Sequence, residues 1–144
     1  NQNISLTIKI HPTAEEYREY EKVLEPYKDV HLSQGDDVID LLRQSNIVIT
    51  PCSSTAGMIA LTMKKPIIIW NFFQVEEDMF LKKGIAIECK KSAELYDCIN
   101  NAESFLEKNK EKINEFIKEN IGEGKAIQKI VYDLEKWLKN NEIR

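Results

Sequence analysis

Apolar residues along this chain follow two alternating patterns, short β-branched runs typical of strands and wider spacings typical of helices. The clearest strand is 66–70, where Ile67, Ile68 and Ile69 leave no polar side to face water. The pattern predicts strands at 4–10, 30–32, 47–50, 66–70 and 85–89. It predicts helices at 13–24, 38–44 and 55–63, and helical sequence from residue 93 onward.

Polar residues at the predicted helix starts support these boundaries. Thr13, followed three residues later by Glu16, has the spacing of a capping box, so we expect the first helix to start there. The stretch Ser33-Gln34-Gly35-Asp36 predicts a turn and a cap for the next helix. The acidic residues 76–78 follow a strand and favour the positive end of a further helix.

Strands that alternate with helices in this way favour parallel βαβ units with right-handed crossovers. The predicted fold class is therefore α/β, a doubly wound (Rossmann-like) parallel sheet with helices on both faces and a long C-terminal helical segment. We expect residues 1–90 to form the Rossmann-like core. Residues 91–144 are expected to form the helical C-terminal segment of the same domain.

The C-terminal segment ends in a strong apolar stripe at three- and four-residue spacing. Gly122-Glu123-Gly124 predicts a break before the helix that carries it. The stripe consists of Ile127, Ile130, Val131, Leu134, Trp137 and Leu138. We expect it to dock on the chain's own sheet or on a domain outside this chain. Because the chain starts at Asn1 without an initiator Met, we expect it to be part of a longer protein.

Composition excludes several classes of function. The net charge of -4 excludes broad electrostatic capture of nucleic acid, which needs clustered Lys and Arg. Three cysteines without a C-x-x-C spacing indicate neither a disulfide framework nor a zinc site, and they favour a cytoplasmic location. No Asp/His cluster predicts a metal site. No apolar run approaches the roughly 20 residues that span a bilayer, while peripheral membrane association through parts outside this chain stays open.

The most informative stretch is 46–55, where a buried-strand pattern ends and small hydroxyl residues lead directly into a helix. The first turn of a helix has unpaired N–H groups and the positive end of the helix dipole, and both attract anions. Ser53, Ser54 and Thr55 add hydroxyl donors without bulk. Such residues also cap ordinary helices, but α/β folds bind ligands at the carboxyl edge of the sheet, and this favours phosphate contact.

Other polar residues also follow predicted strands and are expected at the same edge. His11 precedes Pro12 at the end of the first strand, where its ring could donate to a phosphate oxygen. Ser33-Gln34-Gly35 follows the second strand, and Gln74 follows a later one, where it could reach a sugar hydroxyl. The sequence therefore predicts a phosphorylated or nucleotide ligand.

Short motifs occur in a fixed order along the chain: His11-Pro12, Leu41-Leu42 with Ser45-Asn46, Ser53-Ser54-Thr55, Lys65-Pro66-Ile67-Ile68 and Gly84. In this order they resemble the C-terminal, donor-binding half of GT-B-fold glycosyltransferases. Bacterial capsule and teichoic-acid-type transferases and sialyltransferases have the most similar motifs. The non-hydrolysing UDP-GlcNAc 2-epimerases share the same half-fold.

The resemblance implies transfer of a glycosyl or glycerophosphate group in surface polysaccharide synthesis. The donor would be a nucleotide sugar or another CMP-, CDP- or UDP-linked compound, bound as a substrate with no cofactor. The resemblance places donor phosphate at His11, Ser53, Ser54 and Thr55, base and ribose at Ser33, Gln34 and Gly35, and donor sugar at Gln74. By the same resemblance, His11 would stabilise the charge on the leaving phosphate.

The chain departs from the family pattern in the helix after the hydroxyl residues. Many relatives carry an acid there that binds ribose, whereas residues 56–60 contain none and Ile59 stands in the matching stretch. The acceptor site and the catalytic base would belong to an N-terminal domain outside this chain, so the fragment alone is not expected to turn over substrate. Two alternatives stay open: a UDP-GlcNAc 2-epimerase-like isomerase domain, and a non-catalytic interaction domain that keeps the fold.

Overall fold

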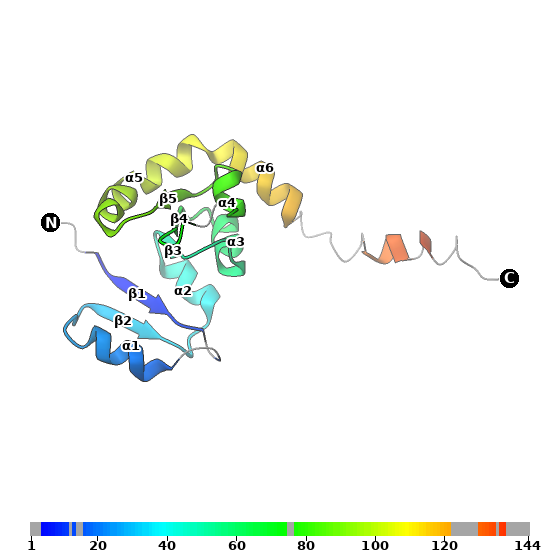
Figure 1. Cartoon of the computed structure of the whole chain (residues 1–144). Coiled ribbons are helices and arrows are strands. Elements are labelled where there is room, and N and C mark those ends of the chain that lie inside the picture. The colour runs from blue at the N-terminus through cyan, green and yellow to red at the C-terminus, as the bar shows by residue number, and fades with distance from the viewer. Residues whose placement is uncertain are drawn as a thin grey trace. The chain divides into compact units, whose positions relative to one another are not determined.

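The computed structural model describes residues 4–11, 13, 16–74, 77–121, 130–134 and 136–137 (Figure 1). Every strand pairing in these residues is parallel, and helices alternate with the strands. The fold is therefore α/β, compatible with a Rossmann-like architecture, as predicted. The chain divides into two compact units, Asn1–Gln44 and Ser45–Arg144.

The first unit consists of β1 (Leu6–Lys9), α1 (Tyr17–Leu24), β2 (Val30–Ser33) and α2 (Val38–Gln44). The strands β1 and β2 form a two-stranded parallel sheet in which Leu6 pairs with Val30 and Lys9 with Ser33. Ile10 and Leu42 are buried. Both predicted strands of this unit are confirmed, and their ends differ from the predicted ends by at most two residues.

The start of α1 differs from the prediction, and the capping box at Thr13 is wrong. The helix begins at Tyr17, with Glu16 in the N-cap position and no side-chain cap bond. The Thr13 hydroxyl lies 3.2 Å from Nδ1 of His11, and the Thr13 N–H donates to the same nitrogen over 3.3 Å. Thr13 is thus held in a local turn with His11, and the helix starts four residues later.

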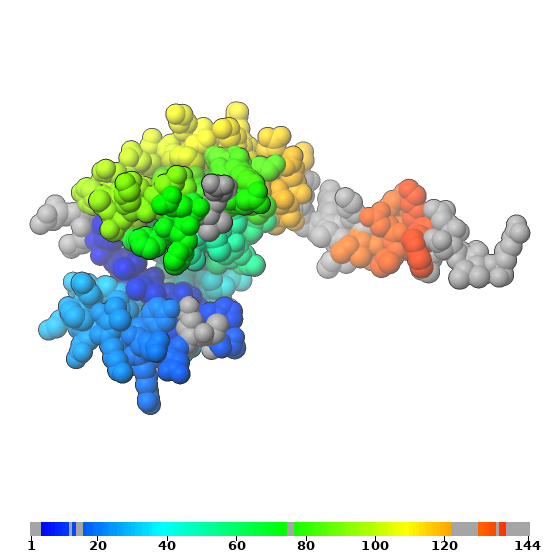
Figure 2. Space-filling view, viewed as in Figure 1, coloured from blue at the N-terminus to red at the C-terminus, as the bar shows by residue number. Residues whose placement is uncertain are grey.

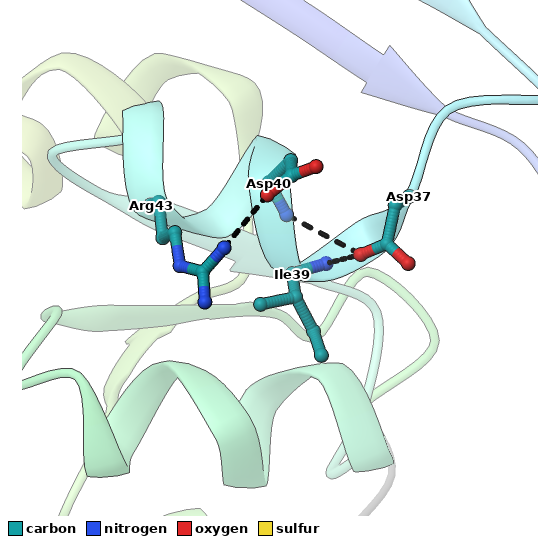
Figure 3. A network of polar contacts seen from close by, with 4 residues as sticks. All are labelled: Asp37, Ile39, Asp40 and Arg43. Carbon is teal, nitrogen blue, oxygen red and sulfur yellow. Dashed lines mark hydrogen bonds and ion pairs between the residues drawn. The ribbon is translucent and has the colours of Figure 1, made fainter.

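The cap of α2 is Asp37, one residue later than the predicted Asp36. Oδ1 of Asp37 accepts hydrogen bonds from the N–H groups of Ile39 (2.7 Å) and Asp40 (3.4 Å), as Figure 3 shows. Arg43 then donates from Nη1 to Oδ1 of Asp40 over 2.8 Å. The carboxylates of Asp37 and Asp40 thus lie at the positive end of the helix, where they stabilise it.

The second unit contains a three-stranded parallel sheet in the order β3-β4-β5. Its elements are β3 (Val48–Thr50), α3 (Thr55–Thr62), β4 (Ile67–Trp70), α4 (Met79–Lys82), β5 (Ile87–Cys89), the 3-10 turn η1 (Ser92–Glu94), α5 (Leu95–Lys108) and α6 (Lys110–Asn120). The predicted strands, the predicted helix at 55–63 and the helical sequence from residue 93 are present as far as residue 121. The long helical segment divides at Asn109, whose N–H and side-chain amide both donate to the carbonyl of Phe105.

The core of the second unit surrounds β4. Ile67, Ile68 and Ile69 are all buried, and because successive side chains of a strand point to opposite faces, both faces of this strand are covered. Helices α3 and α5 both contact β4 (Figure 1). Ile68 packs with Cys89 and Cys98, which brings β5 and α5 together. The residues on either side of position 90 therefore belong to one compact unit.

The C-terminal apolar stripe is only partly within the described residues. The break at Gly122-Glu123-Gly124 lies outside them, as do Ile127 and Leu138 of the stripe. Ile130, Val131, Leu134 and Trp137 belong to the orange-to-red segment of Figure 2, and their exposed fractions lie between 48% and 61%. The described part of the stripe is thus exposed, and its docking on the chain's own sheet or on a domain outside this chain stays a prediction.

Gly57 allows α3 to approach α4 closely. A Cβ atom at this position would lie 2.6 Å from Cε2 of Phe80. The Phe80 ring is fully buried and packs edge-to-face on Phe116, with ring centroids 5.8 Å apart, so it cannot move aside freely.

Replacing Gly57 with alanine should therefore destabilise the protein. We expect Gly57→Ala to lower the free energy of unfolding by about 1–3 kcal/mol through overpacking, although alanine favours helix by about 1 kcal/mol. Urea unfolding measures the change. Gly35→Ala is the control: a Cβ there meets nothing within 4 Å, so its effect should stay within about 0.5 kcal/mol. Equal stability of Gly57→Ala and the parent chain would contradict the tight contact.

Candidate functional site

The hydroxyl residues after β3 form the start of α3, as predicted. Ser54 is the N-cap, with extended backbone (φ -140°, ψ 163°), and its Oγ accepts a hydrogen bond from the N–H of Gly57 over 3.1 Å. The carbonyl of Ser54 accepts from the N–H of Met58. Ser54 therefore has a structural role as the cap, and because its Oγ acts here as an acceptor, its O–H proton is not used in this bond.

Ser53 is held by a carboxylate from 25 residues further along the chain. Its N–H donates to Oδ2 of Asp78 over 2.5 Å, and its hydroxyl donates to Oδ1 over 2.8 Å. The same hydroxyl accepts from the N–H of Phe80 over 3.0 Å. The Asp78 carboxylate thus accepts from both hydrogen-bond donors of Ser53. A contact between Ser53 and a ligand phosphate stays a prediction.

Asp78 is the centre of this arrangement, and we call the contacts among Ser53, Asp78, Phe80 and Leu81 the Asp78 clamp. Asp78 caps α4, where Oδ1 accepts from the N–H groups of Phe80 (2.9 Å) and Leu81 (3.1 Å). Its residue is only 5% exposed. Burial alone would raise the pKa of this carboxyl, but the hydrogen bonds from Leu81, Ser53 and Phe80 outweigh burial and lower it.

Thr55 and Ala56 provide the open donors of the corner. Thr55 is exposed and begins α3. In the described part of the chain, no group accepts a hydrogen bond from the N–H of Thr55 or Ala56. These are two of the N–H groups that the first turn of a helix always leaves unpaired. The corner can therefore still donate to an anion beside Thr55.

The loop after β4 is anchored by Asn71. This buried residue donates its N–H to the carbonyl of Cys89 over 2.9 Å and its side-chain amide to Oε1 of Glu88 over 2.7 Å. Gln74 closes the turn with a left-handed backbone (φ 52°) and donates its N–H to the carbonyl of Asn71 over 3.0 Å. The Gln74 side chain is exposed, and its predicted contact with a donor sugar stays a prediction.

The residues predicted for base, ribose and phosphate in the first unit lie at the ends of its strands. His11 is exposed and contacts Thr13. Ser33 is buried at the end of β2, while Gly35 is exposed. The carbonyl of Gln34 accepts a hydrogen bond from Nζ of Lys9. Because these residues belong to the first unit, their meeting with Ser53, Ser54 and Thr55 of the second unit stays a prediction.

A histidine of β2 lies beside an acidic residue of the turn that follows the strand. His31 Nε2 lies 3.5 Å from Oδ2 of Asp36, and both side chains are exposed. The hydroxyl of Ser33 lowers the pKa of the Asp36 carboxyl most, and His31 and Lys9 add to the effect. Asp36 therefore keeps a negative charge beside the loop that was predicted to approach a base.

Sequence reasoning missed two features of the second unit. The acidic residues 76–78 were expected only to favour a helix start, and nothing local in the sequence indicates that Asp78 reaches Ser53. The second feature is the pair Phe72 and Phe73, which are 62% and 85% exposed. Two consecutive aromatic residues directly after a buried strand are a sequence pattern that could have indicated an exposed aromatic surface.

The described residues contain no group of three or more His, Cys, Asp and Glu side chains placed to hold a metal ion. None of their helices has the length and apolar content needed to cross a bilayer. A shallow hollow of about 630 Å³ on α6, lined by Asn114, Glu115, Lys118 and Glu119, includes no predicted site residue.

No family model, curated protein or solved structure matches this chain. The resemblance to GT-B-fold donor-binding domains therefore rests on the sequence motifs alone and stays a prediction. The function has to be argued from the geometry of the corner after β3.

The Asp78 clamp should make stability depend on pH. Asp78→Asn removes the charge and places an amide where Ser53 needs an acceptor, so we expect a loss of about 1.5–3 kcal/mol at pH 7. Because the folded state lowers the pKa of Asp78, its stabilisation is complete above the ordinary Asp value of about 3.9 and is lost as the pH falls through the folded pKa. Urea unfolding of both proteins between pH 7 and pH 2.5 measures this difference.

Glu77→Gln is the matched control, because the Glu77 side chain is 86% exposed and its ion pair with Lys82, over 3.3 Å, is at the surface. Its effect should stay within about 0.5 kcal/mol at every pH. A difference between Asp78→Asn and the parent chain that is equally large at pH 2.5 and pH 7 would show that the charge of Asp78 has no part in the clamp.

The three thiols should differ in reactivity. Cys52 is exposed, whereas burial and the neighbouring Cys89 raise the pKa of Cys98 to about 11, and Cys89 is buried. Since the thiolate is the reactive form, a disulfide reagent at pH 8 should modify one thiol in the folded chain and three in denaturant. Cys52→Ser should leave no fast-reacting thiol; two fast thiols in the folded parent would contradict the burial of the pair.

Proposed function

We propose that the second unit binds the phosphate of a nucleotide-linked donor at the start of α3, as the donor-binding half of a glycosyltransferase of the GT-B type. One observation carries the proposal: the open N–H groups of Thr55 and Ala56, beside an exposed hydroxyl, follow a strand at the carboxyl edge of a parallel sheet. Such an edge is where α/β folds bind phosphorylated ligands.

The Asp78 clamp gives the three hydroxyl residues different roles. Ser53 is engaged by Asp78 and holds the corner in shape, so the phosphate would lie on the Thr55 side of it. A carboxylate a few ångströms from a phosphate opposes it by about 2–4 kcal/mol at an effective dielectric constant of about 20. One or two charge-assisted hydrogen bonds of about 1.5–3 kcal/mol each offset this cost.

A cationic contact would strengthen the same site further, and His11 is the residue that the motifs assign to it. The motifs also assign Ser33, Gln34 and Gly35 to the base and ribose, and Gln74 to the donor sugar. Transferase activity would belong to the whole protein, together with an acceptor domain outside this chain. A cytoplasmic location and a role in surface polysaccharide synthesis are parts of the same proposal.

Phosphate binding at α3 can be tested with a proline at its first position. Ser54 has the extended backbone that precedes proline readily, and the first helical position tolerates proline, so Thr55→Pro should fold while losing one N–H and the hydroxyl. We expect its affinity for CDP to fall about 10-fold or more, the loss of one charge-assisted hydrogen bond. Amide resonances followed during titration with CMP, CDP, UMP and UDP give the affinities.

The matched control is Ser92→Pro, at the first position of η1, which also follows a residue with extended backbone. This variant should bind CDP like the parent chain. Thr55→Ala, which keeps the N–H, should fall between the two. If none of the four nucleotides moves the resonances of Thr55 and Ala56, or if Thr55→Pro binds CDP like the parent, the proposal is wrong.

A further inference from the structure

Phe72 and Phe73 form an exposed aromatic pair in the loop after β4. Their exposed fractions are 62% and 85%, and their rings meet edge-to-face with centroids 5.6 Å apart and an angle of 88° between planes. Single exposed apolar residues are common, but two adjacent aromatic rings leave a large continuous apolar surface in water. Such a surface is typical of a place where a ligand or a partner binds.

The backbone that carries the pair is anchored on both sides. Before it, Asn71 is buried and bonded to Cys89 and Glu88 of β5. After it, Gln74 has a left-handed backbone, which is uncommon for a residue other than glycine, and its N–H donates to the carbonyl of Asn71. The two rings are therefore presented by a turn with fixed ends.

The same loop leads to the proposed phosphate site. Strands β3 and β4 pair in parallel, with Thr50 opposite Ile69, so the segments that follow them leave the sheet at the same edge. Further along, Asp78 bonds to Ser53, which ties the end of the loop to the corner beside Thr55. The aromatic pair thus lies in the segment that joins the end of β4 to the phosphate corner.

We propose that Phe72 and Phe73 are the stacking platform for the base of the nucleotide whose phosphate binds at the start of α3. This assignment would replace two that rest on the motifs alone, the base at Ser33, Gln34 and Gly35 and the donor sugar at Gln74. This inference rests on the proposed function. The turn 71–74 contains only Asn, Phe and Gln, so it has no charge to hold a phosphate and its exposed surface is mainly aromatic. Aromatic rings stack on the π-face of every base, so the platform would accept pyrimidine and purine nucleotides alike.

The experiment compares ligands with and without a base on the full chain. The ligands are CDP, which has a base, and ribose 5-phosphate, which keeps ribose and phosphate but has none. In the double variant Phe72→Ala/Phe73→Ala we expect CDP to bind about 5- to 150-fold more weakly, the range for loss of one stacked base, and ribose 5-phosphate to bind unchanged. Tyr96→Ala, which removes another exposed aromatic of the second unit, should leave both affinities unchanged.

A second measurement needs no variant. In the parent chain, the H5 and H6 protons of the cytosine should move upfield through the ring currents of the two phenyl groups and give nuclear Overhauser effects to their ring protons. Phe72→Tyr/Phe73→Tyr should keep these signals because it keeps the rings. The absence of both signals in the CDP complex would overturn the inference.

The outcomes separate this inference from the proposed function. If CDP moves the resonances of Thr55 and Ala56 but the double alanine variant binds it unchanged, the platform is wrong and the phosphate site stands. If neither ribose 5-phosphate nor any of CMP, CDP, UMP and UDP binds, both proposals are wrong. If the Phe72 and Phe73 resonances shift with protein concentration in the absence of ligand, and CDP does not compete, the pair is a contact between two copies of the chain and the inference is overturned.

Discussion

The corner after β3 depends on a single buried carboxylate. A charged group taken out of water must be hydrogen-bonded, and Asp78 meets this requirement with donors from two separate segments, Ser53 on one side and the start of α4 on the other. Because water cannot replace these donors at a nearly buried group, the carboxylate fixes how the two segments lie. The helix start that we assign to phosphate has its shape for this reason.

Much of the fold could be predicted from the sequence, because its strands are buried on both faces. A run such as Ile67, Ile68 and Ile69 has no alternative to a covered parallel sheet, and the described strands follow the predicted runs within a few residues. The hydroxyl at position 54 was equally readable as a helix start, because capping depends only on residues within one turn.

What could not be predicted depends on competition between near neighbours or on distant contacts. Thr13 has the spacing of a cap, but it forms a local turn with His11, and α1 begins only at Tyr17. Asp36 and Asp37 are both suitable caps by residue type. Which of them caps α2 depends on the geometry of the turn, and in the structure it is Asp37. The different tasks of Ser53 and Thr55 follow from a carboxylate 25 residues away, which no local pattern encodes.

Phe80 belongs at once to the polar corner and to the apolar core. Its N–H is bonded to Ser53 and Asp78, while its ring lies under Gly57 and against Phe116. A shift of α6 that moves Phe116 would therefore reach these polar groups through Phe80. The helical cover of the sheet and the polar groups at its edge are thus mechanically coupled, and the sequence of α6 is constrained by the corner as well as by the core.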